Sequence, residues 1–207
     1  MTLRTLSRRR AVALVAVPLA AALTLTACGG SDSGDEGGTP SSSSSAAPAG
    51  DWATTDCATI APPATANQPP ADSIVEGEVA VTTAAGVAPT VGIEAAAGNV
   101  TSLVNVDIAE GAGEAVQAGA EVTVEYCGIG MVSKAIFDSS WARGSSITFP
   151  LAGVIAGWQE GLPGMKPGGR RLLIIPADMA YGDNPPAGSG IEAGESLLFV
   201  VDLISSP

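Results

Sequence analysis

The sequence predicts an α+β domain in its C-terminal half: an antiparallel β-sheet wrapped around one short α-helix, preceded by a β-rich extension. Residues 121–127 alternate strictly between apolar and polar side chains, which is typical of a half-buried strand. Residues 170–176 and 196–204 are rich in aliphatic and β-branched side chains, which favour strands. In residues 153–162 the apolar side chains recur at helical spacing, so these residues are predicted to form the helix.

Alternation assigns the side chains of the first strand to two faces. Val122, Val124 and Tyr126 are expected on the core side, and Cys127 on the outer side. A further short strand is expected at residues 146–151. In the last strand the predicted core side carries Leu197, Phe199, Val201 and Leu203.

The outer faces of the two C-terminal strands are unusually apolar. They carry Leu172, Ile174, Leu198 and Val200 at positions where a solvent-facing sheet usually has polar residues. We therefore expect part of residues 51–99 to cover this sheet. That segment has the β-branched content of short strands in 74–83 and 90–93, so it is predicted to be the β-rich extension.

The N-terminus has the features of a targeting segment. Arg4 and residues 8–10 form a basic end, and the apolar stretch 11–25 is shorter than the roughly 20 residues that span a membrane. Small residues then lead to Cys28, as in a bacterial lipoprotein signal. The alternative is plain secretion in which Cys28 has no role, and the arginines weakly suggest twin-arginine export.

The signal predicts a protein held by lipid on Cys28 at the extracytoplasmic face of the bacterial cell membrane. Residues 1–28 are the expected lipoprotein signal peptide. Residues 29–50 are rich in Ser, Gly and Ala, and such a composition predicts a flexible, disordered tether.

Two cysteines remain after Cys28. In an oxidising compartment a pair of cysteines commonly forms a disulfide, so we expect Cys57 and Cys127 to be joined. The alternative is two free, buried thiols.

Composition excludes several kinds of chemistry. The chain has no histidine, which removes His-based triads, His acid–base catalysis and His metal sites. Its net charge of −12 argues against binding to nucleic acid, because an acidic surface repels phosphates. No cofactor or metal is expected.

A series of short motifs follows in order along the C-terminal half. They are residues 124–128, Phe137-Asp138-Ser139-Ser140 with Arg143, residues 154–161, Met165 with 168–171, Ile175-Pro176 with Ala180-Tyr181-Gly182, and residues 197–203. Together they resemble the FKBP-type peptidyl-prolyl cis-trans isomerases. The resemblance covers residues 100–207 and implies an isomerase of X-Pro bonds in secreted proteins, with the FKBP-like fold.

The resemblance also implies roles for individual residues. Trp158 would form the pocket floor, and the Tyr181 hydroxyl and the Ile155 N–H would hold substrate carbonyls. Asp138 would lie at the rim, oriented by Tyr126 and Arg143. The other residues expected to take part in catalysis or substrate binding are Phe137, Phe149, Val154, Ile191 and Phe199.

Three departures from the family pattern affect the pocket, and the first is a stretch between Leu151 and Val154 that is two residues shorter than usual. Ile147 stands where the family often has an aromatic residue, and the loop 183–190 lacks the usual His and one bulky aliphatic. The expected partners are proline-containing polypeptides outside the cytoplasm and a tacrolimus-type macrolide, and we expect a monomer. The alternative function is a non-catalytic FKBP-fold binding module or chaperone at the cell surface. A solute-binding lipoprotein is disfavoured because the chain is too short for two lobes.

Overall fold

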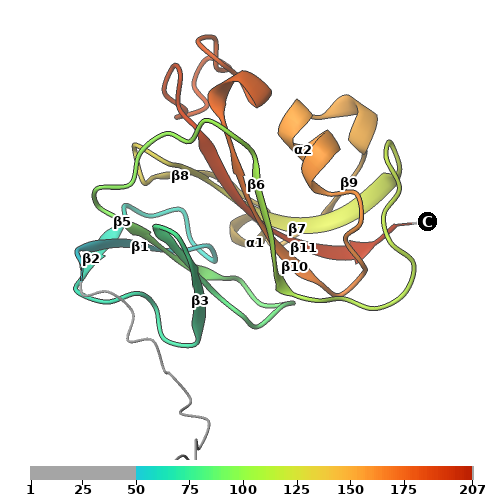
Figure 1. The fold of residues 1–207 in the computed structure, drawn as a ribbon, viewed down its shortest axis with the longest axis horizontal. Helices are drawn as coiled ribbons and strands as arrows, with labels where there is room; N and C mark the ends of the chain where they lie inside the picture. Colours follow the sequence, from blue (N-terminus) through green and yellow to red (C-terminus); the bar gives the residue numbers. More distant parts are fainter. Residues whose placement is uncertain (1–49, 207) are drawn as a thin grey trace, which may run out of the picture. The chain divides into compact units, whose positions relative to one another are not determined.

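The computed structural model describes residues 50–206, which form two antiparallel sheets (Figure 1). The expected signal peptide 1–28, the lipidation site Cys28 and residues 29–49 of the tether lie outside the described residues. Among the helices of residues 50–206, none is long and apolar enough to cross a membrane.

The N-terminal sheet has five strands in the order β2-β1-β5-β4-β3. The run 74–83 folds as a hairpin in which Gly77 takes a positive φ of 57°, a conformation that glycine adopts without steric cost. The first two strands had no clear sequence signal. The strands are β1 (Trp52–Asp56), β2 (Ala64–Ala66), β3 (Ser73–Glu76), β4 (Val79–Thr82) and β5 (Thr90–Glu94).

The C-terminal sheet has six strands. Its main path runs β6-β10-β11-β7-β8, and β9 pairs with the beginning of β7. The four strands that the sequence predicts correspond to β7, β9, β10 and β11. The bounds are β6 (Val104–Ala109), β7 (Glu121–Gly130), β8 (Ile136–Ser139), β9 (Ile147–Pro150), β10 (Arg170–Ile175) and β11 (Leu197–Ser205).

The helices are shorter than predicted. The predicted helix over 153–162 is wrong at its N-terminal end, because α2 covers only Ala156–Gly161 and Ile155 is extended, with a ψ of 151°. A 3₁₀ turn, η1 (Leu151–Gly153), precedes it, and another, η2 (Ala177–Met179), follows β10. A further one-turn helix, α1 (Ser140–Arg143), begins directly after β8.

The C-terminal sheet separates two apolar clusters. On one face, Val122, Val124 and the core side of β11 pack with Trp158 of α2. On the other face, the N-terminal sheet covers the four outer-face residues that the sequence singled out. This second cluster contains Val79, Val81, Val91 and Ile93 from the N-terminal sheet, and Cys127, Ile129, Leu172, Ile174, Leu198 and Val200 from the C-terminal sheet. Residues 51–99 therefore provide the cover that the apolar outer face predicts.

A buried ion pair also joins the two sheets. The guanidinium of Arg170 on β10 donates to both carboxylate oxygens of Asp202 on β11, at 2.6 and 2.9 Å. It also donates to the carbonyls of Thr82, the last residue of β4, and of Val87 in the loop that follows, while the Gly86 N–H of that loop donates to Asp202. The pair therefore holds the segment that joins β4 and β5.

Lys134 ties the end of the N-terminal segment to the turn after β7. Its buried ammonium donates to the carbonyls of Ala97 and Met131. Burial lowers the pKa of Lys134 below its usual value of 10.5, although the nearby carboxylates Glu78 and Glu195 act in the opposite direction.

Candidate active site

A cavity of about 530 Å³ opens on the face of the C-terminal sheet that carries α2. Six of its lining residues are aromatic, and Asp138 is the single carboxylate among them. The lining consists of Tyr126, Phe137, Asp138, Ile147, Phe149, Gly153, Val154, Ile155, Trp158, Tyr181 and Phe199.

A β-bulge directs two consecutive side chains into this cavity. In the pairing of β7 with β8, Gly128 faces Asp138 and Ile129 faces Ile136, so Phe137 between them has no partner. A bulge of this kind re-aims side chains, and here both Phe137 and Asp138 line the cavity. Gly128 makes room for the Phe137 ring, because a Cβ at this position would lie 2.5 Å from that ring.

Asp138 is held by two side chains. The Tyr126 hydroxyl donates to one carboxylate oxygen and the Arg143 guanidinium to the other. Arg143 also donates to the Tyr126 hydroxyl at 3.2 Å and lies 5.5 Å from the centre of its ring. Because the Asp138 and Arg143 side chains are 38% and 41% exposed, their ion pair adds little to stability. Its effect is to fix the orientation of the carboxylate.

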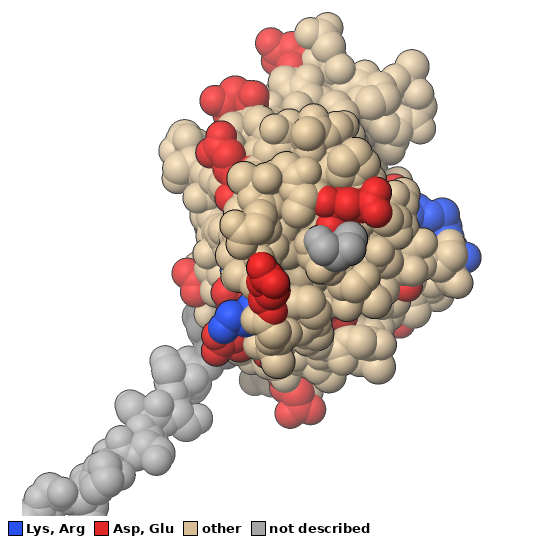
Figure 2. Space-filling model, turned by 90° about the vertical axis from the view of Figure 1, so that its right-hand side faces the viewer, with Lys and Arg blue, Asp and Glu red and all other residues tan. Residues whose placement is uncertain are grey.

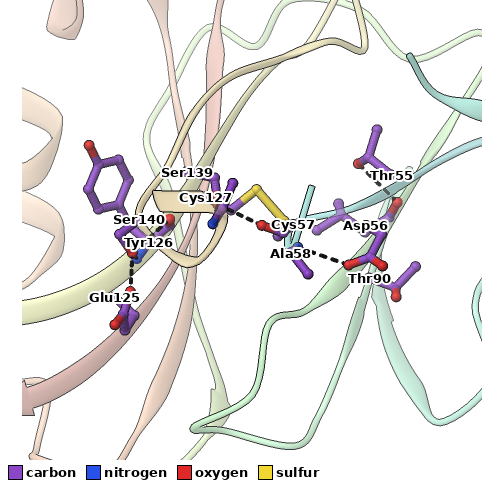
Figure 3. The surroundings of a disulfide bond; sticks show 12 residues. Thr55, Asp56, Cys57, Ala58, Thr90, Glu125, Tyr126, Cys127, Ser139 and Ser140 are labelled. Carbon is purple, nitrogen blue, oxygen red and sulfur yellow. Dashed lines mark hydrogen bonds between the residues drawn. A yellow bond between two sulfur atoms is a disulfide. The ribbon is translucent and has the colours of Figure 1, made fainter. Parts of the chain in front are cut away.

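Ser140 holds the backbone beside this cluster. Its buried hydroxyl accepts a hydrogen bond from the Tyr126 N–H at 2.8 Å and donates to the Glu125 carboxylate (Figure 3). Tyr126 is therefore fixed at both ends, by Ser140 at its backbone and by Asp138 at its hydroxyl.

Trp158 forms the centre of the aromatic wall. Its ring lies edge to face with Phe199 at 5.2 Å and with Tyr126 at 5.6 Å, and Phe149 lies 5.5 Å away. Such arrangements are favourable between aromatic rings. Trp158 is buried, with only 4% of its surface exposed, and it presents an apolar surface to the cavity.

Two glycines allow α2 to place Trp158 at this depth. A Cβ on Gly157 would lie 2.3 Å from Ile175, and one on Gly161 would lie 2.7 Å from Leu173. Both neighbours belong to β10, so larger residues would push the helix off the sheet and lift Trp158 out of the cavity.

Two polar groups at the cavity have no partner among the described residues. The Ile155 N–H lies outside α2, since its residue is the N-cap, and it donates no hydrogen bond within residues 50–206. The hydroxyl of Tyr181, a residue that is 38% exposed, also makes none there. Both groups are therefore available to carbonyl oxygens of a bound molecule.

Most of the predicted site residues meet at the cavity, but two do not line it. Arg143 contacts Asp138 and Tyr126 instead, and Ile191 packs against the apolar cluster beside the cavity. Gly153 and Ile147 line the cavity although the predicted site omits them. Both positions coincide with departures from the family pattern, namely Ile147 itself and the shortened stretch between Leu151 and Val154 that contains Gly153.

The cavity combines an apolar aromatic wall with a carboxylate held by two side chains. No group of His, Cys, Asp or Glu side chains within residues 50–206 could hold a metal ion.

Comparison with known proteins identifies the family to which this chain belongs. The sequence signature of the FKBP-type peptidyl-prolyl cis-trans isomerases matches residues 112–204. A probable FK506-binding protein of Corynebacterium glutamicum is 52% identical over 105 residues, which are 50% of this chain and 86% of that protein. The chain belongs to the family of FKBP-type peptidyl-prolyl cis-trans isomerases.

Other relatives share the same region. The FK506-binding protein of Streptomyces anulatus is 50% identical to this FKBP-type isomerase over 101 residues, covering 48% of this chain and 82% of that protein. The crystal structure of FkpA from Escherichia coli is 37% identical and aligns with a TM-score of 0.47, covering 55% of this chain and 52% of that one.

The family match places the cavity within the isomerase region of the chain. Residues 112–204 contain every cavity-lining residue, and strands β7 to β11 lie almost wholly within them. The N-terminal sheet lies outside the match. The fold of the enzyme is therefore α+β and FKBP-like, with an additional sheet on the face away from the cavity.

Proposed function

We propose that this isomerase accelerates X-Pro isomerisation during the folding of polypeptides outside the cytoplasm, while a lipid on Cys28 anchors it to the membrane. The X-Pro bond rotates over a barrier of about 18–20 kcal/mol, and the uncatalysed reaction takes tens of seconds. No covalent bond forms or breaks, so the enzyme lowers the barrier by binding the twisted amide more tightly than the planar one.

The observation that carries this proposal is the aromatic cavity, in which Asp138 is the single carboxylate. Trp158 would support the proline ring, and the apolar wall would disfavour the more polar planar amide. The Ile155 N–H and the Tyr181 hydroxyl would bind flanking carbonyls. Asp138, oriented by Tyr126 and Arg143, would face the carbonyl of the twisting bond.

Two features support polypeptides outside the cytoplasm as the substrate class. The structure joins Cys57 to Cys127 in a disulfide, a bond typical of oxidising compartments. On the face shown in Figure 2, acidic side chains are widespread and basic ones are few, in agreement with the net charge of −12. Such a surface disfavours nucleic acids and is compatible with polypeptides.

Asp138→Val is expected to lower kcat/KM for a proline-containing peptide about tenfold to a hundredfold, because it removes a charged group at the reacting bond. Phe137→Tyr is expected to lower kcat/KM about tenfold, because it places an unpaired hydroxyl in the apolar wall of the cavity. A coupled isomerisation assay measures both changes.

A tacrolimus-type macrolide should suppress the wild-type activity by filling the same cavity.

Glu160→Gln is the matched control, because Glu160 is an exposed residue of α2 that does not line the cavity. It should retain wild-type activity. A folded wild-type protein with no turnover would refute the catalytic proposal and favour the non-catalytic binding module.

Membrane anchoring has its own test. The wild-type protein expressed in a bacterial host should carry the mass of acyl chains on an N-terminal Cys28. It should also fractionate with membranes, because each methylene buried in the bilayer contributes about 0.8 kcal/mol to the free energy of membrane binding. Cys28→Ser should be released from the membrane without that mass. Equal fractionation of the two proteins would contradict anchoring through Cys28.

A further inference from the structure

The residues that follow Tyr126 and Asp138 face away from the cavity. Cys127 pairs with Ser139 across β7 and β8, on the face that the N-terminal sheet covers. Figure 3 shows Tyr126 and Cys127 directed to opposite sides of their strand. Tyr126 and Asp138 bind one another at the cavity. Each is followed in the chain by a residue that contacts the N-terminal segment, since Cys127 and Ser139 both contact Cys57.

Ser139 makes two contacts with its buried hydroxyl. It donates to the carbonyl of Cys57 at 2.7 Å, a contact between the two sheets (Figure 3). It also accepts the Ala142 N–H at 3.3 Å, which makes it the N-cap of α1. The last residue of α1 is Arg143, which binds Asp138.

The Cys57 side of this contact is held firmly. Its sulfur is bonded to Cys127, and its N–H donates to the Pro89 carbonyl at 3.0 Å. Both cysteines are fully buried. The Cys57 carbonyl, in the turn directly after β1 of the N-terminal sheet, is thus a fixed point against which the hydroxyl of Ser139 is placed.

We propose that Ser139 is a positioning residue through which the N-terminal sheet holds Asp138 and Arg143 in their orientation at the cavity. This inference rests on the proposed role of Asp138 in catalysis. The chain of contacts runs from the Cys57 carbonyl to the Ser139 hydroxyl, and from there through α1 to Arg143 and the Asp138 carboxylate. The family match begins at residue 112, so this support comes from a part of the chain outside it.

Removal of the Ser139 hydroxyl is the direct test. Ser139→Ala in the full chain should lower kcat/KM about threefold to tenfold, the effect expected when one member of a coupled network is lost. Ser139→Gly removes the same hydroxyl but keeps a residue that caps helices well, so it serves as a second variant if the alanine protein folds poorly. Thermal unfolding shows that each variant is folded at the assay temperature.

Ser196→Ala is the matched control. Ser196 is equally buried, and its hydroxyl bonds the backbone of Val100, in the segment that joins β5 of the N-terminal sheet to β6, but it does not contact α1. It should therefore retain wild-type kcat/KM. If Ser196→Ala loses as much activity as Ser139→Ala, general loosening of the interface explains the loss and the proposal is wrong.

A double-mutant cycle separates positioning from a structural role. If Ser139 acts through Asp138, Ser139→Ala should have no further effect on the residual activity of Asp138→Val. An equal loss in both backgrounds, or no loss in the wild-type background, would overturn the proposal. Wild-type activity of Asp138→Val would instead refute the proposed role of Asp138, so the two failures are distinguishable.

Discussion

Asp202→Ala is expected to lower the free energy of unfolding by about 3–5 kcal/mol, the cost of leaving a buried charge without its partner. Arg170 is fully buried and Asp202 is 4% exposed, so water cannot replace the lost carboxylate. The same change leaves the Gly86 N–H without its acceptor. The loss of stability therefore includes the loss of a hydrogen bond that holds the β4–β5 loop of the N-terminal sheet.

Urea unfolding measures this loss, and the exposed ion pair between Lys166 and Glu110 provides the control. Those side chains are 39% and 77% exposed, so Glu110→Ala should cost less than about 1 kcal/mol. Equal losses for Asp202→Ala and Glu110→Ala would contradict the role given to burial. A smaller slope of the unfolding transition in Asp202→Ala would mean that the N-terminal sheet is already detached in the native state.

The outer face of the C-terminal sheet shows why its cover was predictable from sequence. Alternation in a strand fixes which side chains share a face, so Leu172, Ile174, Leu198 and Val200 could be assigned to the face opposite the core. An apolar face needs a cover, and residues 51–99 were the remaining segment able to supply one. The strands β1 and β2 were missed because their small and polar residues give little periodic signal.

The cavity was predictable in its residues but not in its geometry. The motif around Phe137 and Asp138 resembles that of one family, so these residues could be assigned to the cavity. Their directions could not be predicted, because simple alternation in a strand places neighbouring side chains on opposite faces. The bulge that aims both into the cavity forms where β8 pairs with β7, and Gly128 of β7 leaves room for the Phe137 ring. Arg170 and Asp202 were also beyond sequence reasoning, because they are distant in the chain and pair only when β10 and β11 lie side by side.

Loss of the Cys57–Cys127 disulfide is the second large effect that we expect. Cys57→Ala/Cys127→Ala should lower the free energy of unfolding by about 4 kcal/mol, because the bond closes a loop with a sequence separation of 70 and restricts the unfolded chain. The folded protein keeps its other contacts between the sheets, including the apolar cluster and the Arg170 hydrogen bonds. The variant should therefore still unfold in a single transition.

Urea unfolding with and without a reductant tests this effect and its origin. The double variant should be insensitive to the reductant, and the reduced wild-type protein should approach the stability of the variant. Since the disulfide is fully buried, reduction should require unfolding and should be slow under native conditions. Rapid alkylation of both thiols in the native, unreduced protein would show that the disulfide is absent. Two separate transitions in the variant would show that the bond, rather than the shared apolar cluster, makes the two sheets unfold together.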